Sequence, residues 1–230
     1  MDFIFMLTRG DKTIEDCLEL FALVAPLGLR AVGFKDVGVS ARTLGKLTDA
    51  IRRTGAQVCL EVVSQTDADC LRSARMARDL QVDQLFGGTR IEPVLEIIGG
   101  TAIDYYPFPG RPTGHPTRLG GSPAEVEEAC ARYMAAGCAG ADLLAYRATE
   151  ADPVDLVRAA RRGLGQGRLV VAGSVGSRER IKILADVGAD AFTIGSALFD
   201  GSYSPNKGSI LSQLSQVLSD CKAVAQAPCP

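Results

Sequence analysis

Two charged side chains interrupt apolar stretches of the sequence and could do chemistry. Lys35 follows the apolar run Ala31–Phe34, and Glu61 lies within Val58–Val63, which is otherwise apolar or small. A buried carboxylate needs a partner, so we expect Glu61 to point inward and to pair with Lys35. Such a pair could move protons or stabilise an enolate, and a lysine with a lowered pKa could form a Schiff base. The alternative is a purely structural ion pair.

Asp36 directly follows Lys35 and adds a second carboxylate. Carboxylate oxygens suit hard divalent cations, so we assign Asp36 to the catalytic group and regard Asp36 and Glu61 as the ligands if an ion such as Mg²⁺ is used. The chain has a single histidine, and no multi-histidine zinc pattern occurs. The sequence therefore establishes no cofactor.

A long irregular segment, residues 107–121, is rich in proline and glycine. Long loops in compact domains are usually functional, and we interpret this one as a lid. Arg111 is predicted to bind an anionic substrate, and His115 to act as an acid or base. The alternative for a lone histidine is a structural role. Arg147 and Thr89, each just after an apolar run, are also predicted to contact substrate.

The elements that must position these residues form a repeat. Short β-rich apolar runs alternate with helical stretches, and successive runs start about 27 residues apart, close to one βα unit. The eight runs are Phe3–Leu7, Ala31–Phe34, Gln57–Val63, Asp83–Phe86, Ala102–Tyr106, Gly140–Ala145, Leu169–Ala172 and Ala191–Ile194.

Residues typical of helix N-caps lie between these runs. They are Thr13, Ser40, Thr66, Ser122, Asp152 and Ser177. Eight strands alternating with helices indicate an α/β protein, either a closed (β/α)8 TIM barrel or an open doubly wound sheet. No GxGxxG follows the first strand, which favours the barrel. We predict one barrel domain over residues 1–230, with a loose tail from about residue 226.

Two strand ends carry small residues where a barrel often binds phosphate. Gly173 and Ser174 follow the seventh run, and Gly195 and Ser196 follow the eighth. Glycine lets the backbone approach a ligand, and N–H groups at the start of a short helix can donate to an anion. These four residues are predicted to bind phosphate. The alternative is that they only form βα turns.

The segment Gly173–Phe199, including Ala185–Ala191 between the two loops, resembles the ribulose-phosphate-binding barrel superfamily. N-acetylmannosamine-6-phosphate epimerases and keto-deoxy-phosphogluconate aldolases have similar closing segments. In this chain Ser174 replaces the second glycine of the pair often seen in the first loop. The resemblance implies a phosphorylated sugar or sugar acid as substrate. The sixth run lacks the Schiff-base lysine that the aldolases place there, which weakens the aldolase interpretation unless Lys35 has taken over that role.

The sequence thus predicts an enzyme that uses carbanion or enolate chemistry, as an epimerase, an isomerase or an aldol-type lyase. Two alternatives stay open: a Lys35 Schiff-base aldolase and a non-catalytic phospholigand sensor. With a net charge of −2 and no run of Lys or Arg, we expect no nucleic-acid partner. The apolar runs are too short to span a bilayer, and no basic leader precedes the first. We expect a cytoplasmic protein with reduced cysteines, and homo-oligomerisation stays open.

Overall fold

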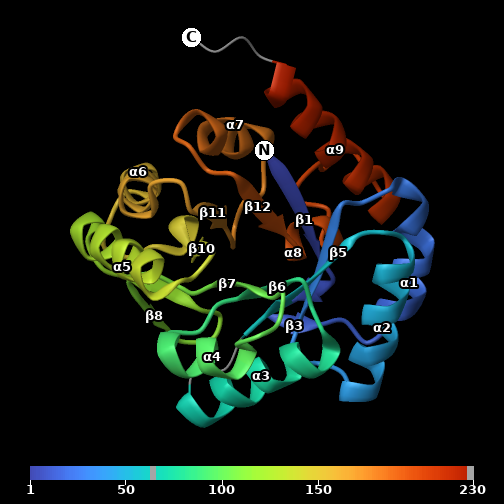
Figure 1. The fold of residues 1–230 in the computed structure, drawn as a ribbon. Helices are drawn as coiled ribbons and strands as arrows, with labels where there is room; N and C mark the ends of the chain where they lie inside the picture. Colours follow the sequence, from blue (N-terminus) through green and yellow to red (C-terminus); the bar gives the residue numbers. More distant parts are fainter. Residues whose placement is uncertain (63–65, 227–230) are drawn as a thin grey trace.

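The computed structural model describes residues 1–62 and 66–226. Eight parallel strands surround a central axis, and helices cover them on the outside (Figure 1). The strands are β1 (Asp2–Met6), β4 (Ala31–Lys35), β5 (Gln57–Glu61), β6 (Gln84–Phe86), β7 (Asp104–Tyr106), β10 (Gly140–Leu143), β11 (Arg168–Val171) and β12 (Ala191–Ile194). Each overlaps one predicted run, so the predicted (β/α)8 fold is confirmed.

The barrel is nearly closed. Hydrogen-bonded neighbours follow the order β10-β11-β12-β1-β4-β5-β6-β7, which leaves β7 and β10 as the two ends of the sheet. Two backbone bonds cross this seam: Ala139 N–H donates to the carbonyl of Tyr105 at 3.1 Å, and Asp142 N–H donates to that of Pro107 at 3.0 Å. The interior is therefore enclosed on all sides.

Helices follow the strands and supply the outer layer. The α-helices are α1 (Cys17–Val24), α2 (Ala41–Arg53), α3 (Asp67–Leu80), α4 (Ile91–Ile98), α5 (Pro123–Ala136), α6 (Pro153–Leu164), α7 (Arg178–Asp186), α8 (Ser196–Phe199) and α9 (Ile210–Gln226), and the short 3-10 turns are η1 (Ala25–Leu27) and η2 (Ala145–Arg147). Five predicted N-caps are confirmed, because each side chain accepts a backbone N–H of its helix: Ser40, Thr66, Ser122, Asp152 and Ser177. The prediction for Thr13 is wrong. That residue lies in a strand.

Side chains alternate between the barrel interior and the helix layer, as they must in a β-strand. In β1, Phe3 and Phe5 belong to the large core shared with the helices, whereas Ile4 and Met6 belong to a smaller cluster inside the barrel. The same alternation decides which polar side chains of the other strands reach the interior.

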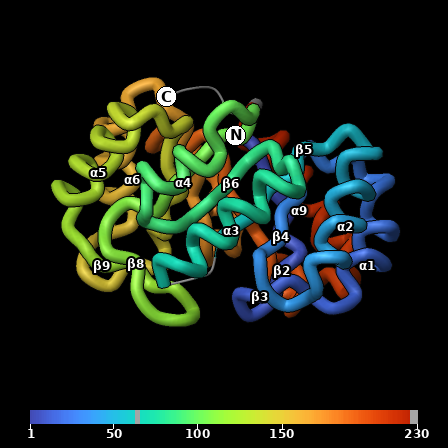
Figure 2. Tube along the Cα trace, turned by 60° about the horizontal axis from the view of Figure 1, so that its bottom comes forward, coloured from blue at the N-terminus to red at the C-terminus, as the bar shows by residue number. Residues whose placement is uncertain are grey.

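Two hairpins extend from one end of the barrel, the end at which the parallel strands finish (Figure 2). One consists of β2 (Thr8–Arg9) and β3 (Lys12–Thr13), directly after β1, and the other of β8 (Arg111–Thr113) and β9 (Arg118–Gly120), after β7. The segment predicted as an irregular lid is thus largely an antiparallel hairpin, whose ladder of backbone hydrogen bonds runs from the Arg111–Gly120 pair to the Thr113–Arg118 pair.

Within the described residues six cysteines are free thiols, and five of them are buried. Cys229 and most of the predicted loose tail lie outside the described residues.

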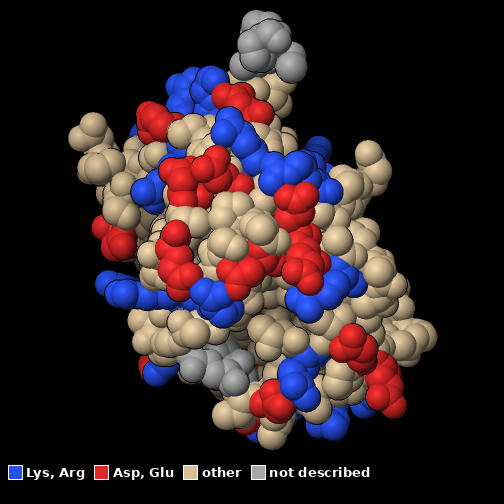
Figure 3. Space-filling model, turned by 90° about the vertical axis from the view of Figure 1, so that its left-hand side faces the viewer, with Lys and Arg blue, Asp and Glu red and all other residues tan. Residues whose placement is uncertain are grey.

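On the face formed by α5 and α6, acidic and basic side chains are interspersed (Figure 3), and Arg162 pairs with Glu127 across the two helices at 2.7 Å. In the described part of the chain, no helix is both long enough and apolar enough to cross a bilayer.

Candidate active site

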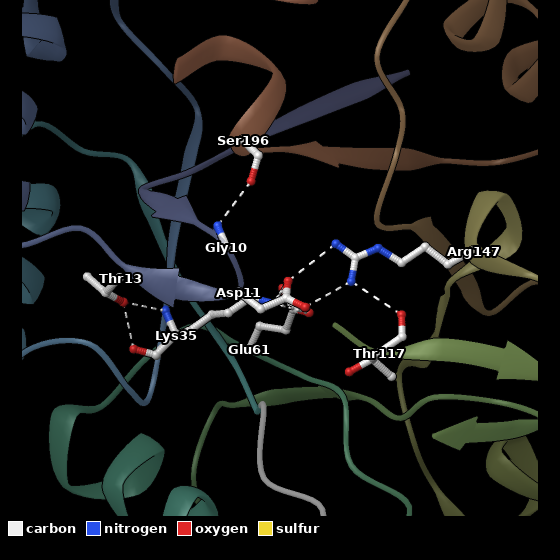
Figure 4. Close-up of polar contacts among 8 residues, drawn as sticks. All are labelled: Gly10, Asp11, Thr13, Lys35, Glu61, Thr117, Arg147 and Ser196. Carbon is white, nitrogen blue, oxygen red and sulfur yellow. Dashed lines mark hydrogen bonds and ion pairs between the residues drawn. The ribbon is translucent and has the colours of Figure 1, made fainter. Parts of the chain in front are cut away.

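Lys35 lies at the centre of a buried charge cluster at the end of the barrel where the hairpins extend (Figure 4). Lys35 and Glu61 are the last residues of β4 and β5, and they face each other in the strand register, so both side chains point inward. Lys35 Nζ lies 3.2 Å from a carboxylate oxygen of Glu61 and 2.9 Å from one of Asp11. The predicted pair therefore exists, with a third member.

Asp11 reaches the cluster from the tight turn between β2 and β3. Its φ of 58° lies in the left-handed region, which aspartate tolerates better than most residues. Thr13 fixes the hairpin to β4: its hydroxyl accepts the Lys35 backbone N–H and donates to the Lys35 carbonyl, both at 2.8 Å. The hairpin thus holds Lys35 twice, by its backbone through Thr13 and by its ammonium group through Asp11.

Arg147, at the end of η2, completes the cluster from the opposite side. Its guanidinium donates to both carboxylate oxygens of Asp11, at 3.1 and 3.3 Å, and to the Thr117 carbonyl at 3.4 Å. Arg147 thus borders the same cavity as Lys35, as a residue that contacts substrate must, and its carboxylate partner is Asp11.

The charges set the protonation of the cluster. Burial opposes ionisation of Asp11, but Lys35 and Arg147 outweigh it and hold the pKa of Asp11 well below its usual range. Burial likewise opposes the charged form of Lys35, yet the negative charges of Glu61 and Asp11 raise the pKa of Lys35 above its ordinary value. The two carboxylates beside Lys35 thus favour its ammonium form over the neutral amine.

One cavity of about 330 Å³ joins this cluster to both predicted phosphate loops. Its lining includes the four charged residues Asp11, Lys35, Glu61 and Arg147, and also residues 173–176 and 195–197. The sequence places these groups far apart, and the barrel brings them to one end because the carboxyl ends of parallel strands meet there.

The glycines of these loops allow close approaches of the backbone. A Cβ on Gly173, whose φ is +75°, would lie 2.4 Å from Nε of Arg147. A Cβ on Gly195 would lie 2.6 Å from the hydroxyl and 2.8 Å from the carbonyl oxygen of Thr8. Gly195→Val would therefore disturb β1 and β2 as well as ligand access, so it cannot serve as the clean test of phosphate binding that the sequence suggests.

Solved structures share this architecture. The native KDPGal structure aligns with 99% of this chain and 97% of its own at 13% identity, with a TM-score of 0.70. Orotidine 5'-phosphate decarboxylase from Pyrococcus horikoshii OT3 aligns with 96% of this chain and 99% of its own, at 14% identity and a TM-score of 0.61. A chain of the tryptophan synthase complex from Pyrococcus furiosus aligns over 95% and 98%, at 15% identity and a TM-score of 0.66.

The likeness covers almost the whole chain and shows that this protein shares the barrel fold of these structures. No protein-family model matches the sequence, and no curated protein matches it either. Because the identities are low, the likeness establishes the fold, and the chemistry must be argued from the side chains in this barrel.

Arg180 is a site residue that the sequence reasoning missed. It lies on α7 and lines the cavity, where its guanidinium donates to the Ser174 carbonyl and stacks on the Tyr146 ring, 4.5 Å from the ring centroid. Within the described residues it makes no ion pair with a carboxylate, whereas Lys35 and Arg147 both do.

Asp36 is not part of the cluster. Its carboxylate accepts the hydroxyl of Ser73 on α3. As the next residue after Lys35, it points to the helix layer because side chains alternate along an extended strand. Asp36 and Glu61 therefore lie on opposite sides of the barrel wall and cannot share a metal ion. Within the described residues, no group of three or more His, Cys, Asp and Glu side chains could hold one.

Three other predicted residues also lie away from the cavity. His115 borders a surface depression with Lys12 and Ser40. Arg111 is half-exposed and pairs with Glu125 and Glu150. Thr89 lines a separate small pocket of about 70 Å³ beside α3 and α4. The structure does not bring these three residues to Lys35.

Proposed function

We propose that this barrel is an enzyme that acts on a small phosphorylated sugar or sugar acid by carbanion chemistry, as an epimerase, isomerase or aldol-type lyase. The observation that carries the proposal is that the Lys35 cluster and the loops at Gly173 and Gly195 line the same cavity. A cavity of about 330 Å³ is at the small end of the range for ligand sites. It suits a compact monophosphate.

A charged side chain and backbone N–H groups both support phosphate binding at the loops that follow β11 and β12. Ser196 and Ala197 begin α8, and the first N–H groups of a helix have no acceptor within the helix. Arg180 adds a cation without a carboxylate partner in the described structure. Asp200, the acidic residue on this side, is engaged by the Ser202 N–H at 2.9 Å. A phosphate here would meet the Arg180 guanidinium and the first N–H groups of α8.

The residues around Lys35 support enolate chemistry. Glu61 borders the cavity and can take a proton from a carbon next to a carbonyl group, as a general base. The Lys35 ammonium and the Arg147 guanidinium are fixed in place by Asp11 before a ligand arrives. Cations fixed beside a developing oxyanion stabilise it without reorganisation, which is the larger part of many rate enhancements.

The Schiff-base alternative receives less support from this geometry. A Schiff base requires a neutral amine, and two carboxylates near Lys35 favour its ammonium form. We therefore expect borohydride with candidate keto acids to trap no adduct on Lys35.

Exchange of substrate protons with solvent tests the proposal whatever the final product. A panel of phosphorylated ketoses, aldoses and keto acids is incubated with the protein in D₂O, and NMR follows deuterium entering the carbon next to the carbonyl. We expect exchange with at least one phosphorylated compound, none with its unphosphorylated form, and a loss of at least about a hundredfold in Glu61→Gln. Glu19→Gln, an exposed carboxylate on α1, is the matched control. Binding of a compound without exchange would favour the sensor alternative.

A further inference from the structure

Asp142 is a buried carboxyl group that the chemistry above does not use. It lies on β10 between Ala141 and Leu143, which pack in the outer core, so its side chain points into the barrel. Its neighbour in the strand register, Val170, belongs to the inner cluster. The residue is fully buried, and neither carboxylate oxygen has a hydrogen-bond partner in the described structure.

The charged groups around Asp142 are already engaged. Lys35 pairs with Asp11 and Glu61, and Arg147 pairs with Asp11. On the adjoining strands, the inward positions hold three further polar side chains. Arg168 on β11 pairs with Asp2 at 2.8 Å, and the Tyr106 hydroxyl on β7 donates at 3.4 Å to Asp104, which lies two residues earlier on the same strand. The two cations nearest to this part of the interior, Lys35 and Arg147, are thus both paired and do not neutralise a negative charge on Asp142.

An ionised carboxylate without a partner is strongly unfavourable in a protein interior, whereas the protonated acid is tolerated. Burial, together with the negative charge of Glu61, raises the pKa of Asp142 well above its usual range. The charge count agrees. Lys35 and Arg147 supply two positive charges, and Asp11 and Glu61 supply two negative ones, so a third anion would leave the interior with a net charge of −1.

We propose that Asp142 stays protonated inside the barrel, while Glu61 carries the negative charge toward the cavity. Asp142 has no exposed surface, whereas Glu61 borders the cavity. Asp142 is thus a positioning residue that acts through Glu61. While Asp142 stays neutral, it does not repel the charge on Glu61, and Glu61 remains an anion that can accept a proton from a ligand.

The protonated state of Asp142 follows from its burial without a partner, and only its use in proton transfer rests on the proposed function. Its test therefore needs no substrate. Carboxyl ¹³C NMR of protein labelled in Asp and Glu reports the ionisation of each side chain across a pH titration. We expect one carboxyl to remain protonated at neutral pH in the wild-type protein, and its resonance to be absent from Asp142→Asn. Asp142→Val, which matches the neighbouring Val170, is a second variant that leaves no polar group buried.

The coupling is tested by Glu61→Gln, which removes the negative charge and leaves Asp142 in place. We expect the protonated carboxyl to ionise about one to three pH units lower in this variant. Asp49→Asn, an exposed carboxylate on α2, should leave the titration unchanged. Absence of a protonated carboxyl in the wild-type protein at neutral pH, or an unchanged titration in Glu61→Gln, would overturn the proposal. Neither result bears on whether the cavity binds a phosphorylated ligand.

Discussion

Lys35 Nζ donates a 2.9 Å hydrogen bond to Asp11, and both side chains are almost completely buried. The bond joins the end of a barrel strand to the turn of a hairpin that follows the first strand. It fixes the ammonium group in the cavity wall and also holds the hairpin over the barrel. A change to either residue is therefore expected to affect stability and ligand chemistry together.

Replacing Lys35 should destabilise the fold. Lys35→Met leaves Asp11 and Glu61 with one cation fewer, and breaking a buried pair in this way costs about 3–5 kcal/mol. Urea unfolding measures the loss. Lys12→Met, at an exposed position of β3, is the matched control and should change the unfolding free energy by less than about 0.5 kcal/mol. Equal stability of the two variants would show that the Lys35 pairs contribute nothing to the fold.

Asp11 should give the protein a steep loss of stability in acid. Its pKa is depressed in the folded state, so it binds its proton more readily when the chain is unfolded. The stabilisation is complete above the unfolded pKa of about 3.9 and is lost as pH falls below that value toward the folded pKa. The unfolding free energy measured from pH 6 down to about pH 3 should fall less steeply in Asp11→Asn than in the wild-type protein. Parallel curves would contradict the depressed pKa.

Arg180 should govern phosphate affinity. A hydrogen bond to a charged group contributes about 1.5–3 kcal/mol, so Arg180→Gln should weaken binding of inorganic phosphate by roughly tenfold to a hundredfold in calorimetry. Its neighbour Arg178 is mostly exposed, and its nearest carboxylate oxygen, on Asp220, lies 3.9 Å away. Arg178→Gln should bind phosphate as the wild-type protein does. If the two variants bind equally, the phosphate is not held by Arg180.

Gly176 offers a cleaner test of the phosphate loops than Gly195. A Cβ on Gly176 would meet only Ala197, at 3.9 Å, which is an ordinary contact. Gly176→Asp should therefore fold while placing a carboxylate between the two loops, and we expect phosphate affinity to fall at least about tenfold through repulsion. Gly176→Ala is the control for size and should bind nearly normally. A normal affinity in Gly176→Asp would place the anion elsewhere.

Arg111 should prove to be a structural surface residue. Its guanidinium pairs with Glu125 and Glu150 on the outside of the barrel. Exposed ion pairs contribute about 0–1 kcal/mol each, so Arg111→Ala should lower the unfolding free energy only slightly. Phosphate binding, measured by calorimetry, should be unchanged. A marked loss of affinity would restore the lid interpretation of the β8–β9 hairpin.

The eight strands and five helix N-caps could be predicted from the sequence because their signals are local. Apolar runs, capping side chains and glycine positions each express a preference of a few neighbouring residues. The pairing of Lys35 with Glu61 was also predictable, since both end adjacent strands and a buried carboxylate requires a partner.

Only the tertiary structure decided which distant groups meet. Asp11 reaches Lys35 through a hairpin turn with a left-handed residue, and Arg147 reaches Asp11 across 136 positions of sequence. The assignment of Asp36 to the catalytic group is wrong. Side chains still alternate one residue beyond the end of β4, and this turns Asp36 toward Ser73 on α3. Asp142 and Arg180 carry no local signal. The burial of Asp142 depends on closure of the barrel, and the isolation of Arg180 depends on which carboxylates the other cations engage. Both properties depend on how charged groups from distant segments are arranged in the folded barrel. No single segment of the sequence determines that arrangement.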